Sequence, residues 1–146
     1  MKTFLPLPKI IDGISLKLNE EFGDEYKIYP EEVKQGLNRP CFFIKLLSSD
    51  NTKVVGDTYH RTNPYCVHFY PDITNEAKTV CQEMLERLYQ ALEYITVDGN
   101  LVRGVNMSGE IHDEILLFYV SYNVFVRRTY EQEKMETLEI ELGTKG

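Results

Sequence analysis

Three histidines are the residues of this 146-residue chain whose side chains most often bind metals or transfer protons. They are His60, His68 and His112, and none of them belongs to an HExxH motif or a similar ligand spacing. His60 and His68 fall on separate expected strands that could approach one another, so a metal site there is the alternative to a chain without one. The spacing itself predicts no bound metal and no cofactor.

Nucleophilic and phosphate-binding motifs are also missing from the sequence. Cys41, Cys66 and Cys81 are odd in number, widely spaced and surrounded by apolar residues, which predicts free buried thiols in a reducing compartment. Residues 112–114 combine a histidine with two carboxylates, but they have the composition of a polar turn. There is no GxGxxG, GxxxxGK[ST] or GxSxG sequence. We therefore predict no catalytic centre and no enzyme activity.

The length and charge of the chain narrow its class further. A length of 146 residues suits a single domain, and no run of about 18 apolar residues is present that would span a membrane. Residues 1–8 contain two prolines and lack a signal-peptide pattern, so we expect an extended N-terminal arm. The net charge of −7 opposes tight binding to DNA phosphates. The acidic residues form two groups in the sequence. These groups are interpreted either as two solvent-exposed faces or as an acidic surface that a negatively charged molecule such as DNA passes without binding.

Two amphipathic helices are predicted from apolar residues spaced three and four apart. The first covers residues 8–22 and contains Gly13, which costs stability inside a helix. The second covers residues 75–95, with Thr74 and Asn75 as the candidate caps of its start and residues 98–100 as its stop. The second helix needs a sheet on which to bury its apolar stripe.

The remaining segments alternate as strands do. Six are expected, and they cover residues 26–29, 41–47, 53–60, 65–70, 101–107 and 114–127. Short turns at 48–51 and 61–64 favour a three-strand antiparallel meander, and Ser108-Gly109 is expected to be a further turn. The order α-β-β-β-β-α-β-β predicts an α+β fold, a mostly antiparallel sheet flanked by two helices.

One strand and the tail carry apolar side chains that a compact domain does not need. Residues 114–127 are apolar on both faces, which suggests a central strand or a face covered by another subunit. The acidic tail, residues 130–146, alternates over 134–142 as an edge strand or a strand exchanged with a neighbour would. The candidate subunit or tube interface therefore comprises Tyr119, Phe125, Arg127, Arg128, Leu138, Ile140 and Leu142.

Five stretches carry a resemblance to a known family. They are IIDGISLKLNEEFG (10–23), YPEEVKQGL (29–37), PCFFIKLL (40–47), NPYCVHFY (63–70) and LFYV (117–120). In pattern and order, over about residues 9–128, they resemble the small tail terminator proteins of phages, prophages and phage tail-like particles of Gram-positive bacteria. The resemblance includes no catalytic motif.

This resemblance implies a structural role and a sheet flanked by helices. It implies a homomeric ring, usually a hexamer, that caps the tail tube, stops its polymerisation and docks neck or collar proteins. The implied partners are further copies of the chain, the tail tube protein, and sheath and neck proteins. The implied location is the bacterial cytoplasm during assembly and then the finished particle.

Three other functions remain open at this point. A head-completion or connector protein would share the ring symmetry but bind the portal side. A small enzyme would need a cleft with a strongly shifted carboxylate or histidine. A monomeric ligand-binding domain would show a single-subunit mass in solution.

Overall fold

The computed structural model describes residues 7–30 and 36–127. Its elements in chain order are α1 (Leu7–Phe22), β1 (Lys27–Tyr29), β2 (Cys41–Leu46), β3 (Asp50–Val55), β4 (Thr58–Thr62), β5 (Pro64–Tyr70), α2 (Ala77–Ala91), β6 (Tyr94–Val97), β7 (Asn100–His112), β8 (Ile115–Tyr122) and β9 (Val124–Arg127). This confirms the α+β class. Neither of the helices within the described ranges is long and apolar enough to cross a membrane.

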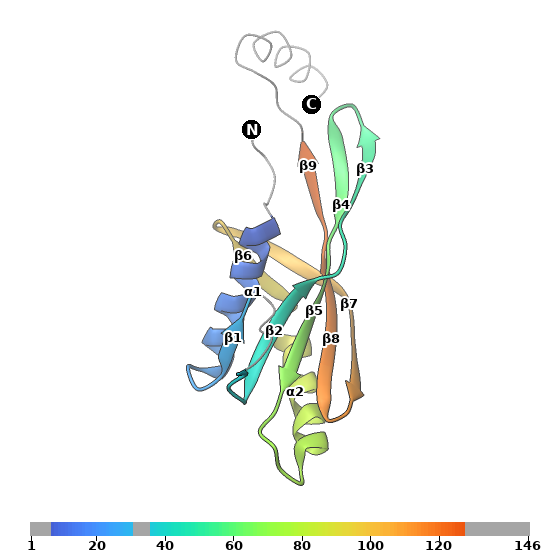
Figure 1. Cartoon of the computed structure of the whole chain (residues 1–146). Helices are drawn as coiled ribbons and strands as arrows, with labels where there is room; N and C mark the ends of the chain where they lie inside the picture. The colour runs from blue at the N-terminus through green and yellow to red at the C-terminus, as the bar shows by residue number, and fades with distance from the viewer. Residues whose placement is uncertain (1–6, 31–35, 128–146) are drawn as a thin grey trace.

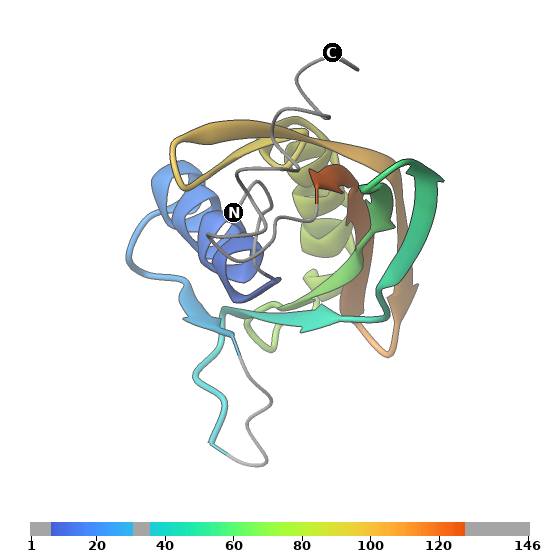
Figure 2. The ribbon, with the colours of Figure 1, turned by 90° about the horizontal axis from the view of Figure 1, so that it is seen from above.

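Six strands form the main sheet, in the order β1-β2-β5-β8-β7-β6. Every pairing is antiparallel except that of β1 with β2, which is parallel. Seen from above, the sheet curls around both helices (Figure 2). Helix α2 packs on β7 and β8, while α1 contacts the two edge strands β1 and β6. Helix α1 therefore covers the gap that the curled sheet leaves open.

The core lies between the concave face of this sheet and the two helices. Apolar side chains of α1 and α2 recur every three or four residues, and alternate residues of the strands meet them. Central members of the core are Ile10, Ile14, Leu18, Phe42, Ile44, Val67, Leu88, Leu92, Leu116, Phe118 and Val120. The helical stripes predicted from the sequence are confirmed as the buried faces.

Helix α2 is shorter than predicted, because the segment after it forms a hairpin. The helix ends at Ala91, and Ile95 belongs to β6, which pairs with the start of β7. Asp98 and Gly99 have φ of 51° and 80°, so they form the hairpin turn and not the helix stop. The predicted cap at Thr74 and Asn75 is wrong, because the N-cap residue is Glu76, which has no side-chain cap hydrogen bond. The Oγ1 of Thr74 accepts a hydrogen bond from the backbone N–H of Glu76 at 3.2 Å, in the turn before the helix.

Packing against β6 explains why glycine occupies position 13 of α1, although glycine is a poor helix former. A Cβ at this position would lie 2.8 Å from the carbonyl oxygen of Thr96 and 3.0 Å from Val97 Cγ2. Since both belong to β6, the absent side chain lets α1 approach the edge of the sheet. Glycine at this position lowers the stability of the helix itself, but it allows a close contact between α1 and β6 that any residue with a Cβ would prevent.

The expected turn at Ser108-Gly109 is wrong, because β7 runs through it as one strand. An irregularity between Val105 and Ser108, with Asn106 at φ 55°, keeps the pairing to β8. A Cβ on Gly109 would lie 2.5 Å from Leu85 Cδ1 of α2. The glycine therefore makes room for the helix and does not mark a chain reversal.

The expected three-strand meander is also wrong. Residues 53–60 do not form one strand; they contain the tight turn of the hairpin β3–β4, with Gly56 at φ 53°. Strand β2 pairs directly with β5. Strands β3 and β4 instead form a second, three-stranded sheet with β9, in the order β3-β4-β9.

The expected single strand 114–127 is divided at Asn123. Strand β8 pairs with β5 in the main sheet, and β9 pairs with β4 in the second one. The register is the same on both sides of the division, since Arg61 faces Val124 and Pro64 faces Ser121. The second sheet therefore continues the main one, and it extends beyond the helices (Figure 1). We call β3, β4 and β9 the projecting sheet.

Candidate interaction surface

Buried polar side chains mark the point where the projecting sheet leaves the body. Asn63 is fully buried, and its Nδ2 donates a hydrogen bond to the carbonyl oxygen of Tyr122 at 3.0 Å. The N–H of Tyr122 donates back to the carbonyl oxygen of Asn63, also at 3.0 Å. Ser49 Oγ donates to Asn63 Oδ1 at 2.8 Å. These bonds join the β2–β3, β4–β5 and β8–β9 segments at one place.

The projecting sheet exposes apolar side chains on its two outer strands. Phe125 on β9 is 66% exposed, and Val54 and Val55 on β3 are 55% and 70% exposed. The ring of His60, on the central strand β4, lies 5.0 Å from the ring of Phe125. Every residue of β3 is exposed. A sheet this small does not bury enough apolar surface to be stable by itself, which favours a role in contacts with other proteins.

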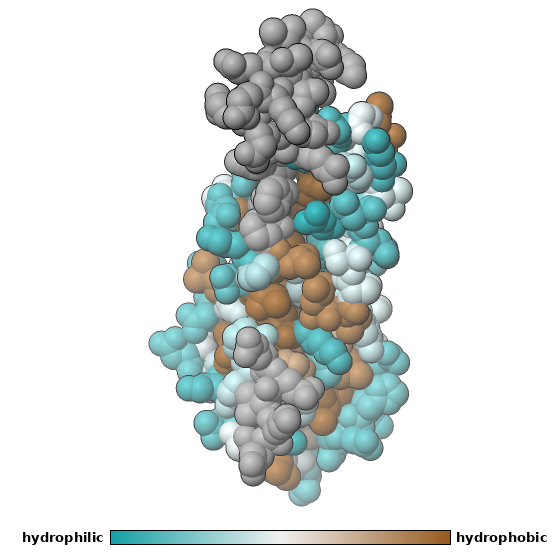
Figure 3. Space-filling model, turned by 45° about the horizontal axis from the view of Figure 1, so that its top comes forward, coloured by the Kyte–Doolittle hydropathy of each residue, from teal (hydrophilic) through white to brown (hydrophobic). Residues whose placement is uncertain are grey.

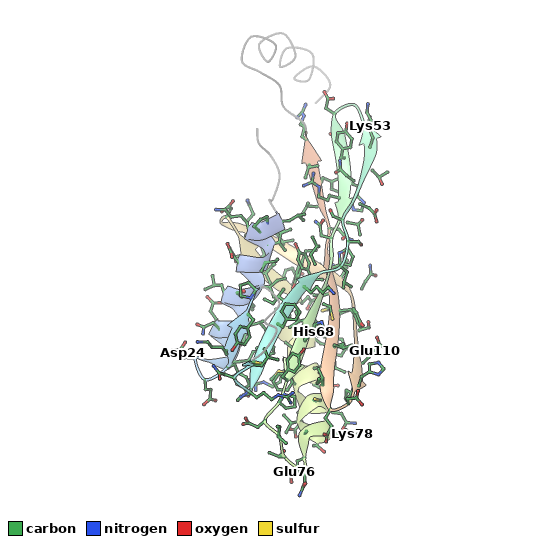
Figure 4. The ribbon with its side chains drawn as sticks, viewed as in Figure 1. Asp24, Lys53, His68, Glu76, Lys78 and Glu110 are labelled. Carbon is green, nitrogen blue, oxygen red and sulfur yellow. The ribbon has the colours of Figure 1, made fainter. Side chains whose placement is uncertain are left out.

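A row of mixed side chains lies on the convex face of the main sheet, in which Phe43 is buried and Glu110 is exposed. One cross-strand row joins Phe43, His68, Leu117 and Glu110, so their side chains share that face. The ring centroids of Phe43 and His68 lie 5.1 Å apart. Figure 4 shows His68 and Glu110 on the body, and Lys53 near the tip of the projecting sheet.

Hydrogen bonds shift the titration of two groups on this convex face. Glu110 accepts hydrogen bonds from His112, at 3.2 Å, and from the Tyr119 hydroxyl, and these lower the pKa of its carboxyl. The hydrogen bond between Tyr119 and Glu110 also raises the pKa of the Tyr119 hydroxyl. Glu110 and His112 are both well exposed, so the trio is a surface network and not a catalytic dyad in a cleft.

The space-filling view shows how apolar residues are distributed on one side of the molecule. They gather in a band along the middle, with hydrophilic residues on both sides (Figure 3). An apolar band framed by polar residues is typical of a surface that contacts other proteins.

The structure places the sequence-predicted interface residues in two regions. Phe125 and Arg127 lie together on β9, whereas Tyr119 lies on β8 in the main sheet. The remaining four, Arg128, Leu138, Ile140 and Leu142, lie outside the described residues, as does the expected tail strand. The structure adds Val54 and Val55, which the sequence analysis did not single out. In the sequence, the two adjacent valines before Gly56-Asp57 could have indicated a β-hairpin with an exposed apolar edge.

The structure separates the histidines that the sequence left as a possible metal site. His60 lies on β4 against Phe125, while His68 lies on β5, in the other sheet, between Phe43 and Tyr70. No cluster of three or more histidine, cysteine or acidic side chains that could hold a metal occurs within residues 7–30 and 36–127. Cys41, Cys66 and Cys81 are free and buried, as predicted.

A cavity of about 470 Å³ opens beside the start of α2. Tyr26, Phe69 and Val80 supply its apolar lining, and Asp72 and Glu76 supply carboxylates. No histidine or cysteine lines it, and the Glu110 carboxyl, whose pKa is lowered, lies elsewhere on the surface.

Comparison with known proteins agrees with a role in protein contacts. The model of a family described as phage tail terminator protein matches residues 9–134. No curated protein matches the chain. One solved structure aligns with 83% of this chain and 97% of its own, at 14% identity and a TM-score of 0.34, a likeness too low to carry an argument. The family match covers all nine described strands, α2 and all but the first two residues of α1, so the chain belongs to the phage tail terminator family, whose members are structural components of the tail and not enzymes.

Proposed function

We propose that this chain forms a closed ring of identical copies, a hexamer, on the end of the finished tail tube. The ring stops tube polymerisation and offers neck or collar proteins a docking surface. Family membership supports the tail-completion role. The observation that carries the ring is the projecting sheet, which extends past the helices and exposes apolar side chains on both outer strands.

Ring closure requires two different complementary patches on each copy, because head-to-tail contacts join unlike surfaces. Phe125 and Arg127 on β9 are proposed as one contact region, and Tyr119 on the convex face as a contact with the tube or a neighbour. Arg128 and the tail residues Leu138, Ile140 and Leu142 are proposed as a further contact region, with the tail as an edge or exchanged strand that lies away from the β9 edge.

The remaining partners follow from the same role. The chain contacts the tail tube protein, the neck or collar proteins and, in a contractile tail, the sheath. Its net charge of −7 lets DNA pass the ring without being held. Assembly takes place in the bacterial cytoplasm, and the protein then stays in the particle. The whole chain is proposed to be one domain. Of the N-terminal arm expected at residues 1–8, Leu7 and Pro8 belong to α1, and the first six residues lie outside the described residues.

Tail length measured by electron microscopy tests the terminator role. Deleting the gene should give tails of abnormal length that do not join their neck, and the wild-type gene supplied in trans should restore both. Phe125→Lys should fail to restore them, because it places a charge on the exposed edge. Leu16→Lys changes an exposed apolar residue of α1 and serves as the matched control. Normal tails in the deletion strain would overturn the proposal.

A binding experiment separates a terminator from a head-completion protein. Purified protein is incubated with isolated tail tubes and, separately, with heads that carry a portal. A terminator sediments with the tubes and decorates one end of them. Sedimentation with the heads alone would identify a connector protein instead.

A further inference from the structure

We propose that the projecting sheets of neighbouring copies pair edge to edge, β9 of one copy with β3 of the next, to form one continuous closed sheet around the ring. This inference rests on the ring of the proposed function. It assigns the subunit contact to a backbone pairing between two named strands.

Both edges of the projecting sheet are open in the part of the chain that the structure describes. The strand order is β3-β4-β9, and within the described residues neither outer strand has a second neighbour. Unpaired edges are normally blocked by proline, by charge or by a covering element. Residues 50–55 and 124–127 contain no proline, and no element covers these edges within the described residues. They carry the charged residues Asp50, Lys53 and Arg127, and beside these the exposed apolar residues Val54, Val55 and Phe125, which favour a contact with another protein strand.

The strand directions decide how two such edges meet. Strands β3 and β9 are both antiparallel to β4, so both run in the same direction, away from the body. In a ring with cyclic symmetry whose axis runs along the projecting sheets, as this pairing requires, every copy points its sheet to the same side. Strand β9 of one copy and β3 of the next therefore run parallel, and the contact is a short parallel ladder.

A second copy of this chain suits these edges better than a foreign strand does. A single foreign strand would pair with one edge and leave the other open. A two-fold dimer would pair like with like, β9 with β9, and leave both β3 edges open. A cyclic ring pairs both edges of every copy through one repeated contact, with the Phe125 edge against the Val54 and Val55 edge.

Engineered disulfides can detect this contact, because the geometry within one chain prevents them. Thr52 pairs with His60, and His60 pairs with Phe125, so Thr52 and Phe125 lie in one row two strands apart. Two strand spacings are about 10 Å, whereas a disulfide needs Cα atoms about 4.4–6.8 Å apart. The native cysteines, Cys41, Cys66 and Cys81, are buried and do not compete.

The experiment compares double and single cysteine variants of the full chain. Thr52→Cys/Phe125→Cys and Val54→Cys/Phe125→Cys are oxidised with copper–phenanthroline, in purified tails and as concentrated free protein. At least one double variant should give a ladder of covalent oligomers that ends at the copy number of the ring. Each single variant should stay monomeric, and a mixture of Thr52→Cys with Phe125→Cys should stop at the dimer. Leu16→Cys/Phe125→Cys is the control for random collisions.

Three outcomes would overturn the pairing. The first is no ladder from either double variant, in tails or in free protein, while the reduced variants melt like the wild type and restore normal tails. The second is a dimer from Phe125→Cys alone, which indicates a two-fold contact. The third is a monomeric disulfide in Phe125→Cys/Leu138→Cys, which indicates that the chain's own tail occupies the β9 edge.

Failure of the pairing is distinguishable from failure of the proposed function. Deletion of the gene tests the function through tail length, without reference to cross-linking. If the deletion disturbs the tails but no ladder forms, the terminator role stands and the β9–β3 pairing is wrong. If tails are normal without the gene, a ladder in free protein still supports the pairing as a contact between copies.

Discussion

The backbone N–H of Asn63 donates a hydrogen bond to the Oδ1 of Asn123 at 3.2 Å, across the two strands that carry the projecting sheet. The same Oδ1 accepts a hydrogen bond from Ser121 Oγ at 2.5 Å. The two asparagines interrupt their strands at neighbouring positions, between β4 and β5 and between β8 and β9. Side-chain hydrogen bonds therefore connect the chain where the regular ladders are interrupted.

Replacing the buried asparagine tests this connection. Asn63→Ala removes the bond from Nδ2 to the carbonyl oxygen of Tyr122 and leaves that oxygen with one partner fewer. The free energy of unfolding, measured with urea, should fall by about 1–3 kcal/mol, the usual cost of losing a buried hydrogen bond. Asn75→Ala, at an exposed position, is the control. A loss no larger than that of the control would show that the asparagine is dispensable.

The central leucine of α2 tests the packing of that helix. Leu88 is fully buried in the core, so Leu88→Ala should lower the free energy of unfolding by about 2–5 kcal/mol through lost contacts and a new cavity. Gln82→Ala, on the exposed face of the same helix, should change stability by less than about 0.5 kcal/mol. A loss below about 0.5 kcal/mol at Leu88 would contradict its buried position.

The glycine of α1 should behave opposite to its helix propensity. Gly13→Ala stabilises a free helix, but here the new Cβ would meet the backbone carbonyl of Thr96 at 2.8 Å. We expect the free energy of unfolding to fall by about 1–3 kcal/mol, as overpacking of a core contact does. Glu20→Ala, on the exposed side of α1, is the matched substitution. Thermal melting would refute the close contact if Gly13→Ala were the more stable protein.

Burial of a thiol gives a prediction about pH. Burial raises the pKa of the Cys66 thiol from 9.0 to about 11, with a smaller opposing effect of Lys45. A thiol that holds its proton more tightly when folded stabilises the protein below pH 9.0, and this contribution is lost as the pH rises toward 11. The stability difference between wild type and Cys66→Ala should therefore shrink between pH 9 and 11. A constant difference across this range would contradict the shift.

The acidic character of the chain predicts weak DNA binding. The chain has a net charge of −7, and its sequence contains no cluster of Lys and Arg that would neutralise DNA phosphates. Fluorescence anisotropy with labelled duplex DNA at physiological salt should show no saturable binding in the micromolar range. A sub-micromolar affinity that weakens steeply with added salt would contradict this expectation.

Local patterns in the sequence determined the elements whose signal lies within one segment. The stripes of Ile14, Leu18 and Phe22 and of Met84 and Leu88 predicted the buried faces of both helices correctly. Ile11, also predicted, is only partly buried, and Ile10 takes the core position beside it. Alternation likewise predicted the positions of β2, β5 and β8 and the α+β class. These predictions held because helical and strand periodicity depend on burying one side of a single element.

The division into two sheets was decided by tertiary structure alone. Residues 114–127 alternate without a break, yet Asn123 divides them, because β8 pairs with β5 while β9 pairs with β4, about 60 residues earlier. Gly13 and Gly109 read as a weak point and a turn in the sequence, but each makes room for a neighbouring element. Pairing partners and close approaches depend on residues distant in the chain, which no local pattern records. The exposure of Phe125, and with it the candidate interaction surface, follows from where the helices end relative to the strands, which is a property of the folded chain.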